Sequence, residues 1–381
     1  MNILIDIRLL GPGGNSGIEE YTRQLLTHLF ALDAKNHYTL FYNGVIKTPL
    51  PPLVKNHPNV SIMDWRVPNR LLDLSMRIIH RPQIDRGRNF DLMFSPHFTQ
   101  ASTAHTPRII TFHDLSFLHH HDFFRARQKF WHWLQNFRET ARDADHIIAD
   151  SEFTKYDLVH TLHVPEEKIT VIAPGVNPAL HPLPASNAGL KEFRTRHNLN
   201  FPFLLSVGTL EPRKNIQGLI RAFNLLKRDT QFSDLRLIIA GREGWLYENI
   251  LTEAKRSPHQ DHIIFWGKMS EDDKLYLYNQ AVVFLYPSFF EGFGFPPLEA
   301  QACGTPVILG DRTSLPEIVG DSAIRVNPWN IDEIAFELKR VLGDQTLRTT
   351  LIENGKENAK RFNWETTAKK TLTLFKHYES R

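Results

Sequence analysis

The sequence contains one cysteine, Cys303, among 381 residues. A single cysteine cannot form an internal disulfide, and it excludes a zinc site built from several cysteines. Chains without disulfides are typical of reducing compartments, so we expect a cytoplasmic protein. No apolar run reaches the ~18–20 residues that a membrane-spanning helix requires, and residues 1–10 lack a signal-peptide pattern. Asp6 and Arg8 interrupt that first run, which therefore predicts a buried strand.

The net charge is also small, +3 at pH 7, and we expect no nucleic-acid partner. The positive charge is nevertheless uneven. Between Trp65 and Phe90, two aspartates stand against Arg66, Arg70, Arg77, Arg81, Arg86 and Arg88. Two interpretations stay open: a solvated helical face, or a surface for anionic lipid headgroups, which would make the protein peripheral at the inner face of the plasma membrane.

Aromatic and basic residues alternate in a neighbouring segment, 123–142. As one helix it would place Phe130, Leu134, Phe137 and Ala141 on a single face, which would pack on a sheet. Trp131 lies about 100° from Phe130 around that helix, so one core face does not absorb every aromatic side chain. Together with the arginines, this composition predicts reversible, salt-sensitive binding to anionic membranes.

Short apolar runs alternate with longer segments of helical period along the whole chain. This order indicates parallel sheets covered by helices on both faces, and it places the protein in the α/β class. The runs are Ile3–Ile7, Tyr38–Tyr42, Leu92–Ser95, Arg108–Phe112 and His146–Ala149, then Phe203–Val207, Leu235–Ala240, His262–Phe265, Val282–Tyr286 and Pro306–Leu309.

Prolines and a glycine interrupt the alternation at residues 174–184, PGVNPALHPLP. We therefore expect two doubly wound domains, at 1–174 and 185–363. Ligands of such sheets bind beyond the carboxyl ends of the strands, so the strand-to-helix turns are where we expect the chemistry.

The first of these turns runs from Gly11 to Gly17 and includes Gly14. Glycines allow a ligand to approach the backbone, and the following helix N-terminus favours an anion. The turn matches neither a P-loop nor a dinucleotide fingerprint, because Gly-Lys-Ser/Thr is missing and Ser16 stands where the latter needs glycine. A flexible turn without a ligand remains the alternative.

A second turn, Gly208–Asn215, carries Arg213 and Lys214 before a helix. This adjacent pair can clamp a diphosphate; a solvated basic pair is the alternative.

The most specific pattern is SFFEGFGFPPLEA at residues 288–300. Its prolines suit the first turn of a helix, so Glu291 is expected in a loop and Glu299 on the opening turn of that helix. Loop amides and the helix N-terminus form a seat for an anion, flanked by two carboxylates that can accept hydrogen bonds from sugar hydroxyls. A simple helix-terminal charge is the alternative for Glu299. We expect packing not to depend on Glu291 or Lys214, because both lie on turns.

His113 follows the run Arg108–Phe112, which predicts a position at the ligand-binding edge of the first sheet. A core or capping histidine is the alternative. The three histidines at 119–121 do not predict a metal site, because consecutive residues cannot all face one ion. No Asp-x-Asp triplet is present, and we expect no metal cofactor.

These elements together resemble the retaining GT-B glycosyltransferases of family 4 over nearly the whole chain. The resemblance rests on residues 5–8 with the glycine turn, 111–115, 149–154, 172–176 and 208–215, and on the Glu-x7-Glu motif from Glu291 to Glu299. It implies two Rossmann-like domains, the first for the acceptor and the second for a nucleotide sugar. Residues 362–365 resemble the start of the helix that crosses back to the first domain, here 364–381.

The resemblance also implies roles for individual residues. Arg213 and Lys214 would hold the donor diphosphate, Glu291 the donor sugar and Glu299 the ribose hydroxyls. His113 would lie beside the transferred sugar. Further donor contacts would come from Gly14, Gly17, Gly208, Gly292, Phe293, Gly294 and Phe295, and acceptor contacts from His97 and Asp114. This chain departs from the family at the opening turn of the helix after the glycine turn, where relatives often carry Gly-Arg-Tyr and this chain has Glu19-Glu20-Tyr21.

Among family members, residues 6–8, 16–23, 95–97 and 113–115 are most similar to bacterial mannosyltransferases that build O-antigen-type polysaccharides. This similarity implies GDP-mannose as the donor and a glycan or lipid-linked saccharide as the acceptor. Two other readings stay open: a nucleotide-sugar enzyme of the same architecture, such as a 2-epimerase or sugar-phosphate synthase, and a non-catalytic nucleotide-sugar sensor.

Overall fold

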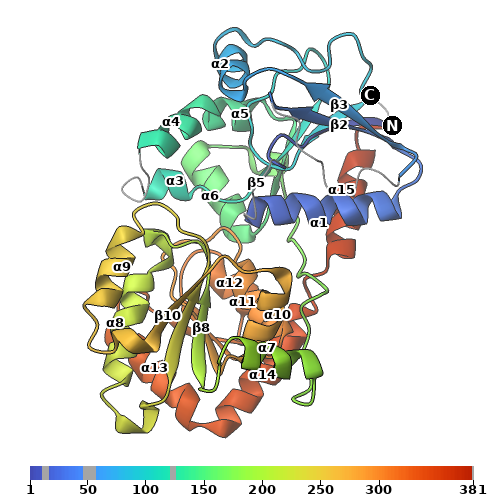
Figure 1. The fold of residues 1–381 in the computed structure, drawn as a ribbon. Coiled ribbons are helices and arrows are strands. Elements are labelled where there is room, and N and C mark those ends of the chain that lie inside the picture. The colour runs from blue at the N-terminus through green and yellow to red at the C-terminus, as the bar shows by residue number, and fades with distance from the viewer. Residues whose placement is uncertain (11–16, 46–56, 121–125, 380–381) are drawn as a thin grey trace. The chain divides into compact units, whose positions relative to one another are not determined.

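The structure is a computed structural model that describes residues 1–10, 17–45, 57–120 and 126–379. The chain divides into two compact units (Figure 1). The first unit contains Met1–Gly175 and Asn363–Arg381, and the second contains Val176–Phe362. The proline-rich residues 176–184 thus belong to the second unit, and the last helix belongs to the first.

A parallel sheet in the order β3-β2-β1-β4-β5-β6-β7 forms the centre of the first unit. Its strands are β1 (Asn2–Asp6), β2 (His37–Asn43), β3 (Val60–Trp65), β4 (Leu92–Ser95), β5 (Arg108–Phe112), β6 (His146–Ala149) and β7 (Ile169–Val171). Its helices are α1 (Gly17–Leu32), α2 (Asn69–Ile79), α3 (Ser116–His119), α4 (Ala126–Leu134), α5 (Phe137–Asp143), α6 (Glu152–Leu162) and α15 (Trp364–Lys376).

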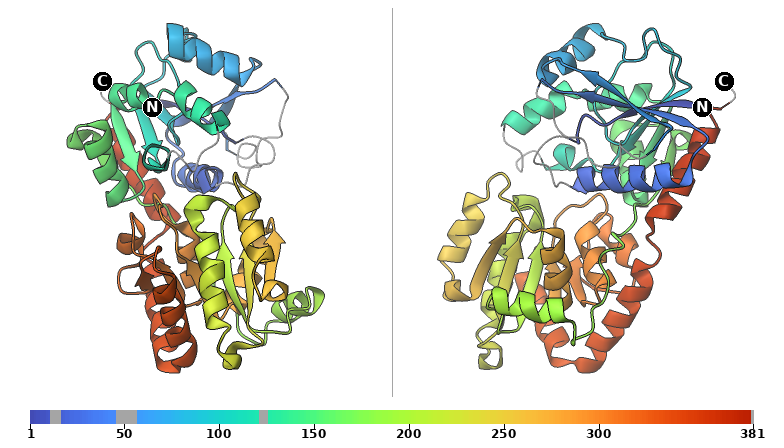
Figure 2. Two further views of the ribbon diagram at one scale, coloured as in Figure 1. Left: turned by 90° about the vertical axis from the view of Figure 1, so that its left-hand side faces the viewer. Right: turned by 45° about the vertical axis from the view of Figure 1, so that its right-hand side comes forward.

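The C-terminal helix α15 lies beside α1, although more than 300 residues separate them (Figure 2). The Tyr21 and Trp364 rings pack edge to face at 5.7 Å, and Phe375 is fully buried against Phe94. The absence of a side chain at Gly175 allows the start of α15 to pack against it, because a Cβ on Gly175 would lie 2.2 Å from the backbone nitrogen of Trp364. The last helix is therefore an integral part of the first unit.

The second unit contains a parallel sheet in the order β10-β9-β8-β11-β12-β13. Its strands are β8 (Phe203–Val207), β9 (Arg236–Ala240), β10 (Ile263–Gly267), β11 (Val283–Tyr286), β12 (Val307–Gly310) and β13 (Ile324–Val326). Its helices are α7 (Ala188–Arg196), α8 (Ile216–Leu226), α9 (Glu248–Lys255), α10 (Glu271–Gln280), α11 (Phe295–Ala302), α12 (Leu315–Val319), α13 (Ile331–Gly343) and α14 (Gln345–Ala359).

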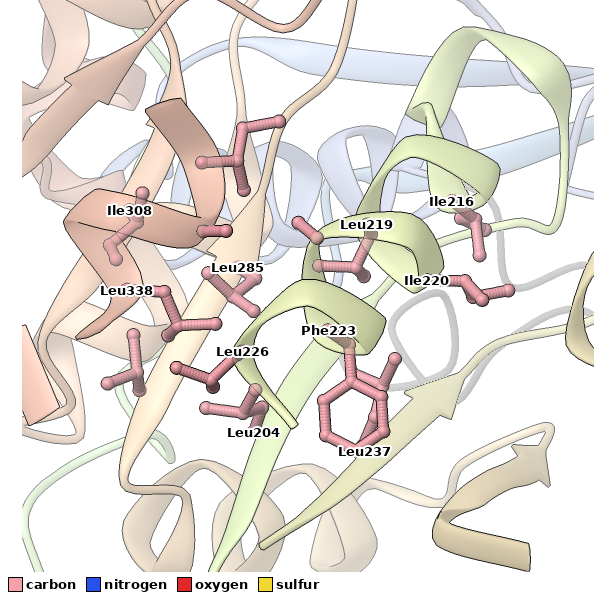
Figure 3. Packing of buried hydrophobic residues seen from close by; sticks show 14 of the residues in the cluster. Leu204, Ile216, Leu219, Ile220, Phe223, Leu226, Leu237, Leu285, Ile308 and Leu338 are labelled. Carbon is pink, nitrogen blue, oxygen red and sulfur yellow. The ribbon is translucent and has the colours of Figure 1, made fainter. Parts of the chain in front are cut away.

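Both faces of this second sheet are buried, which explains its continuous apolar strands. Along β8, Leu204 belongs to one core, whereas Phe203 and Leu205 belong to the other. Figure 3 shows the core that contains Leu204, in which Leu219 and Phe223 of α8 pack against the strands. The predicted α/β class and the two doubly wound sheets are confirmed.

Two local predictions are wrong. The segment 123–142 is not one helix, because α4 ends at Leu134 and α5 starts at Phe137, with Asn136 between them in the left-handed conformation (φ 45°). As a result Phe130 is exposed, whereas Trp131 packs against the core. Glu299 lies on the second turn of α11, because this helix begins at Phe295, one residue before the proline pair.

Candidate functional site

The strand order of the second unit reverses between β8 and β11, the position where doubly wound sheets bind ligands. The turn after β8 forms a short 3-10 helix, Pro212–Lys214, and the loop after β11 carries Glu291. The two turns are joined by the Phe289 amide, which donates to the carbonyl oxygen of Arg213 at 2.9 Å, and by the Ser288 hydroxyl, which donates to Glu291 Oε1 at 2.6 Å and lies 3.0 Å from the same carbonyl oxygen. The topology thus brings together residues that are far apart in sequence.

Arg213 and Lys214 converge on the carboxylate of Glu291. The Arg213 Nη1 lies 2.8 Å from Glu291 Oε2, and the Lys214 Nζ lies 2.6 Å from Oε1. Burial alone would raise the pKa of Glu291, but the two cations and the Ser288 hydroxyl lower it to about 2. Burial and the neighbouring Arg213 lower the pKa of Lys214 more than Glu291 raises it. The two cations and the carboxylate form one charged network, in which Glu291 is buried and the two cations are partly buried.

Glu211 is a fourth member of this network. Its Oε1 accepts hydrogen bonds from the Arg213 Nε at 3.0 Å and Nη2 at 2.6 Å, and the residue is buried. We did not assign it from the sequence, although its position beside Pro212 and Arg213 was a usable signal. The quartet of Glu211, Arg213, Lys214 and Glu291 carries two charges of each sign, so its cations are held in place before any ligand binds.

This network corrects the expectation that packing does not depend on Glu291 or Lys214. Glu291 is only 6% exposed and Lys214 also donates to the Tyr286 hydroxyl. Removal of one member of a buried ion pair leaves an uncompensated charge, which costs about 3–5 kcal/mol.

Glu299 lies in a separate polar cluster on α11. Its Oε2 accepts a hydrogen bond from the Tyr278 hydroxyl at 2.7 Å, and the Lys274 Nζ is 3.6 Å from its Oε1. Burial and the Glu299 charge raise the pKa of Tyr278 well above its usual range, so the phenol remains a donor. Glu299 is therefore an acceptor that Tyr278 holds through one oxygen. Neither Tyr278 nor Lys274 was singled out from the sequence.

The glycines of the second unit shape these loops. Gly294 is the N-cap of α11 with φ 115°, a conformation that side-chain-bearing residues rarely adopt, and Gly292 is buried beside it. Gly208 follows β8, and a Cβ on Gly241 would lie 1.9 Å from the Gly208 carbonyl oxygen. Phe293 is buried against the rings of Phe295 and Phe362, so only its backbone can serve a ligand.

In the first unit, His113 follows β5 and is held by residues after the two neighbouring strands. Its Nδ1 lies 2.6 Å from Asp150 Oδ2, after β6, and its Nε2 lies 2.9 Å from the Pro96 carbonyl oxygen, after β4. Both partners are acceptors, so both ring nitrogens carry hydrogens. Burial alone would lower the pKa of His113, but Asp150 and the Pro96 carbonyl outweigh it and raise the pKa. His113 is thus a fixed imidazolium, and Asp150 is a partner that the sequence did not reveal.

The two residues predicted on the acceptor side have different roles: His97 packs against His113, and Asp114 stabilises a turn. The buried His97 ring stacks between His113 at 5.6 Å and Trp131 at 5.9 Å, and burial lowers its pKa well below the usual value. Asp114 accepts hydrogen bonds from the backbone nitrogen and hydroxyl of Ser116, at 2.9 and 2.7 Å, and so caps the turn into α3.

The structure describes only the last residue, Gly17, of the glycine turn at residues 11–17. Gly14 lies outside the described residues, and Gly17 is the exposed first residue of α1. The Glu20 carboxylate pairs with Arg23 and accepts a hydrogen bond from Gln24, both on the same helix.

The described residues contain no group of three or more His, Cys, Asp or Glu side chains placed to hold a metal ion. In the same part of the chain, no helix is long and apolar enough to cross a membrane.

Two family models match the chain in succession. The model described as Glycosyltransferase Family 4 matches residues 15–180, and the model described as Glycosyl transferases group 1 matches residues 190–358. The O-antigen chain mannosyltransferase B of Escherichia coli is 29% identical over 385 residues, which cover 95% of this chain and 96% of that protein.

Solved structures share the fold over the full length. Sucrose-phosphate synthase from Thermosynechococcus elongatus superimposes with a TM-score of 0.77 at 21% identity, covering 99% of this chain and 98% of its own. An Anabaena protein in complex with UDP-glucose gives a TM-score of 0.73 at 16% identity, covering 99% and 100%.

Proposed function

The chain belongs to the GT-B glycosyltransferases, with a family 4 first half and a group 1 second half, and on this premise we propose that it transfers mannose from GDP-mannose to a glycan or lipid-linked saccharide in bacterial polysaccharide synthesis. The observation that carries the proposal is the buried quartet around Glu291 at the switch point of the second sheet. The choice of mannose rests on the similarity to the O-antigen mannosyltransferase.

The donor occupies the second unit in this proposal. Arg213 and Lys214 contact the diphosphate, Glu291 the sugar and Glu299 the ribose hydroxyls. Tyr278 donates to Oε2 of Glu299, so the other oxygen, Oε1, which lies 3.6 Å from the Lys274 Nζ, is suited to accept a hydroxyl hydrogen. Cations that are already oriented stabilise the charge that develops on the departing diphosphate without reorganising during the reaction. We propose that these oriented cations hold the diphosphate without a divalent ion, which makes the reaction metal-independent.

The first unit binds the acceptor, and the transfer proceeds with retention of configuration. The acceptor hydroxyl attacks the anomeric carbon from the face that the diphosphate leaves. The sugar–phosphate bond breaks, and a phosphate oxygen takes the hydroxyl proton. Since both His113 nitrogens already donate to acceptors, we assign His113 an electrostatic role beside the sugar, not a proton-transfer role. His97 and Asp114 would border the acceptor.

Incubation of the purified chain with labelled GDP-mannose and a lipid-linked glycan tests this proposal. Extension of the glycan with an α-linked mannose supports it. Release of a free epimer would favour a 2-epimerase, transfer to a sugar phosphate would favour a sugar-phosphate synthase, and donor binding without turnover would favour a sensor.

We also propose that the first unit docks on an anionic membrane through α2 and α4, which contact each other. These helices expose large apolar side chains that a protein in water normally buries: Leu71 (60%), Ile78 (63%), Ile79 (61%), Phe130 (51%) and Trp133 (48%). The guanidinium of Arg77 lies 4.1 Å from the Trp133 ring, and other arginines lie within α2 or close to it in sequence: Arg66, Arg70, Arg81, Arg86 and Arg88. Exposed aromatic and basic side chains together are typical of interfacial surfaces.

Co-sedimentation with phosphatidylglycerol vesicles tests this docking. Each basic residue near such a surface contributes about 1 kcal/mol, so replacing Arg77, Arg81, Arg86 and Arg88 with glutamine should release the protein. Phe130→Ser should weaken binding, whereas the control Phe336→Ser, at a side chain of the second unit that is 64% exposed against 51% for Phe130, should not. Binding that is absent at low salt, or indifferent to the arginines, would contradict docking.

A further inference from the structure

An exposed tryptophan of the second unit is held close to the Glu291 quartet. Trp329 lies between β13 and α13 and is 55% exposed. The side-chain amide of Asn215, in the turn after β8, donates to the carbonyl oxygen of Pro328 at 2.6 Å. The Phe289 ring, in the loop after β11, lies 5.0 Å from the Trp329 ring. Trp329 is therefore anchored to both of the turns that carry the quartet.

The loop after β12 adds a cation to this surface. Arg312 is exposed, and its Cζ lies 5.0 Å from the centre of the Trp329 ring. The next residue, Thr313, has φ 56°, an outlier for a β-branched residue, and its hydroxyl accepts a hydrogen bond from the Glu291 amide at 3.0 Å. Strained backbone of this kind persists where the surrounding structure fixes it, and it is concentrated at functional sites.

Phe289, Arg312 and Trp329 together form a surface that we call the Trp329 platform. Their loops follow β11, β12 and β13, which are consecutive neighbours in the sheet, so all three loops lie at its ligand-binding edge. Single exposed aromatic side chains are common on protein surfaces. Trp329 differs from these because three loops position it and two of them also hold Glu291.

The platform offers hydrogen-bond donors beside its rings. Within the part of the chain that the structure describes, no group accepts a hydrogen bond from the Trp329 indole N–H, and the Arg312 guanidinium has no ion pair or hydrogen bond. Aromatic rings present flat, electron-rich apolar faces, which suit the C–H faces of a sugar ring. Donors at the edge of such a face suit the hydroxyl oxygens that surround the sugar. This chemistry fits a neutral saccharide.

The platform lies away from the residues that we assign to the nucleoside end of the donor. Tyr278 of α10, which holds Glu299 of α11, belongs to the core on one face of the sheet. Helix α13, which follows Trp329, packs with α8 in the core on the other face. The ribose and the platform would therefore lie on opposite sides of the quartet, which leaves the platform to the saccharide end.

We propose, on the basis of the proposed function, that the Trp329 platform binds the acceptor glycan in addition to the first unit. A sugar ring that precedes the receiving one packs on Trp329, and Arg312 and the indole N–H donate to its hydroxyls. The acceptor hydroxyl must reach the anomeric carbon beside Glu291, which brings the preceding rings toward the platform. The platform thus selects acceptors by length, because a single sugar ring in the reacting position does not extend to it.

Transfer from GDP-mannose to methyl α-mannoside, a single ring, and to α-linked mannotetraose tests this inference. The measured quantity is the ratio of kcat/KM for the tetraose to kcat/KM for the mannoside. Trp329→Ala should lower this ratio about tenfold, as expected when an anchoring aromatic side chain is removed. Arg312→Met should lower it as well, because it removes the donors and keeps the apolar stem. The matched control is Phe336→Ala, which removes a 64% exposed ring from α13 and should leave the ratio as in wild type.

The ratio compares two acceptors on the same variant, so a general loss of folding or chemistry cancels. An unchanged ratio in Trp329→Ala overturns the inference: equal losses with both acceptors would indicate a structural role, and a higher KM for GDP-mannose alone would place the donor on the ring.

Saturation-transfer NMR with mannotetraose requires no turnover and separates this inference from the proposed function. If wild type transfers no mannose but saturates the tetraose severalfold more than Trp329→Ala does, the proposed function fails and the platform stands. If wild type transfers mannose but both proteins saturate the tetraose equally, the platform fails and the proposed function stands.

Discussion

Replacement of Glu291 by glutamine tests the buried quartet, because it removes one charge and keeps the side-chain volume. The structure predicts a large loss of stability. The fall of the Glu291 pKa from 4.5 to about 2 corresponds to about 3 kcal/mol. The usual cost of breaking a buried ion pair by removing one partner, about 3–5 kcal/mol, agrees with this value.

The pH dependence has a defined sign. A carboxylate whose pKa is lowered by folding stabilises the protein above its unfolded pKa, here 4.5. This contribution is lost as the pH falls through about 2. The stability difference between wild type and Glu291→Gln should therefore be constant near neutrality and shrink below about pH 4.5.

Hydrogen exchange followed by mass spectrometry measures the effect in the second unit alone, through peptides that cover β8 and β11. The matched control is Glu253→Gln in the same unit. It breaks an ion pair in which the largely exposed Arg221 donates two hydrogen bonds to Glu253. Surface pairs contribute about 0–1 kcal/mol, so the control should change protection little. Equal protection in Glu291→Gln and the control would refute the quartet as a stabilising network.

Three further predictions address other parts of the molecule. Asp150→Asn removes the negative charge beside His113, so the His113 pKa measured by NMR should fall; an unchanged value would contradict the imidazolium assignment. Gly175→Ala places a methyl group against the Trp364 backbone and should lower the melting temperature, whereas Gly343→Ala, which meets no atom within 4 Å, should not; equal melting temperatures would refute the proposed return of α15. Glycosyl transfer should survive a strong chelator; a loss that magnesium or manganese restores would contradict metal independence.

The central strands could be predicted from the sequence because burial on both faces leaves a continuous apolar run. The observed bounds of Arg108–Phe112, His146–Ala149 and Phe203–Val207 match the predicted ones. The strands missing from the predicted runs, β3, β7 and β13, all lie at sheet edges. An edge strand such as Val60–Trp65 is half exposed and therefore lacks such a run.

The candidate site was predictable only in part. Arg213, Lys214 and Glu291 stand in turns that follow strands, and the strand order brings those turns together. Their partners were not predictable, because Asp150 reaches His113 and Tyr278 reaches Glu299 through contacts between distant elements. The break at Asn136 was missed because apolar periodicity continues across it while the backbone there becomes left-handed.

The central claim is that the quartet of the second unit binds a nucleotide sugar whose mannose is transferred. The most direct measurement is product analysis by mass spectrometry and NMR after incubation with GDP-mannose and a lipid-linked glycan acceptor. The account predicts one added α-linked mannose per turnover with wild type, and a rate lower by orders of magnitude with Lys214→Met. Transfer only from a different nucleotide sugar would contradict the donor assignment, and an undiminished rate in Lys214→Met would contradict the site.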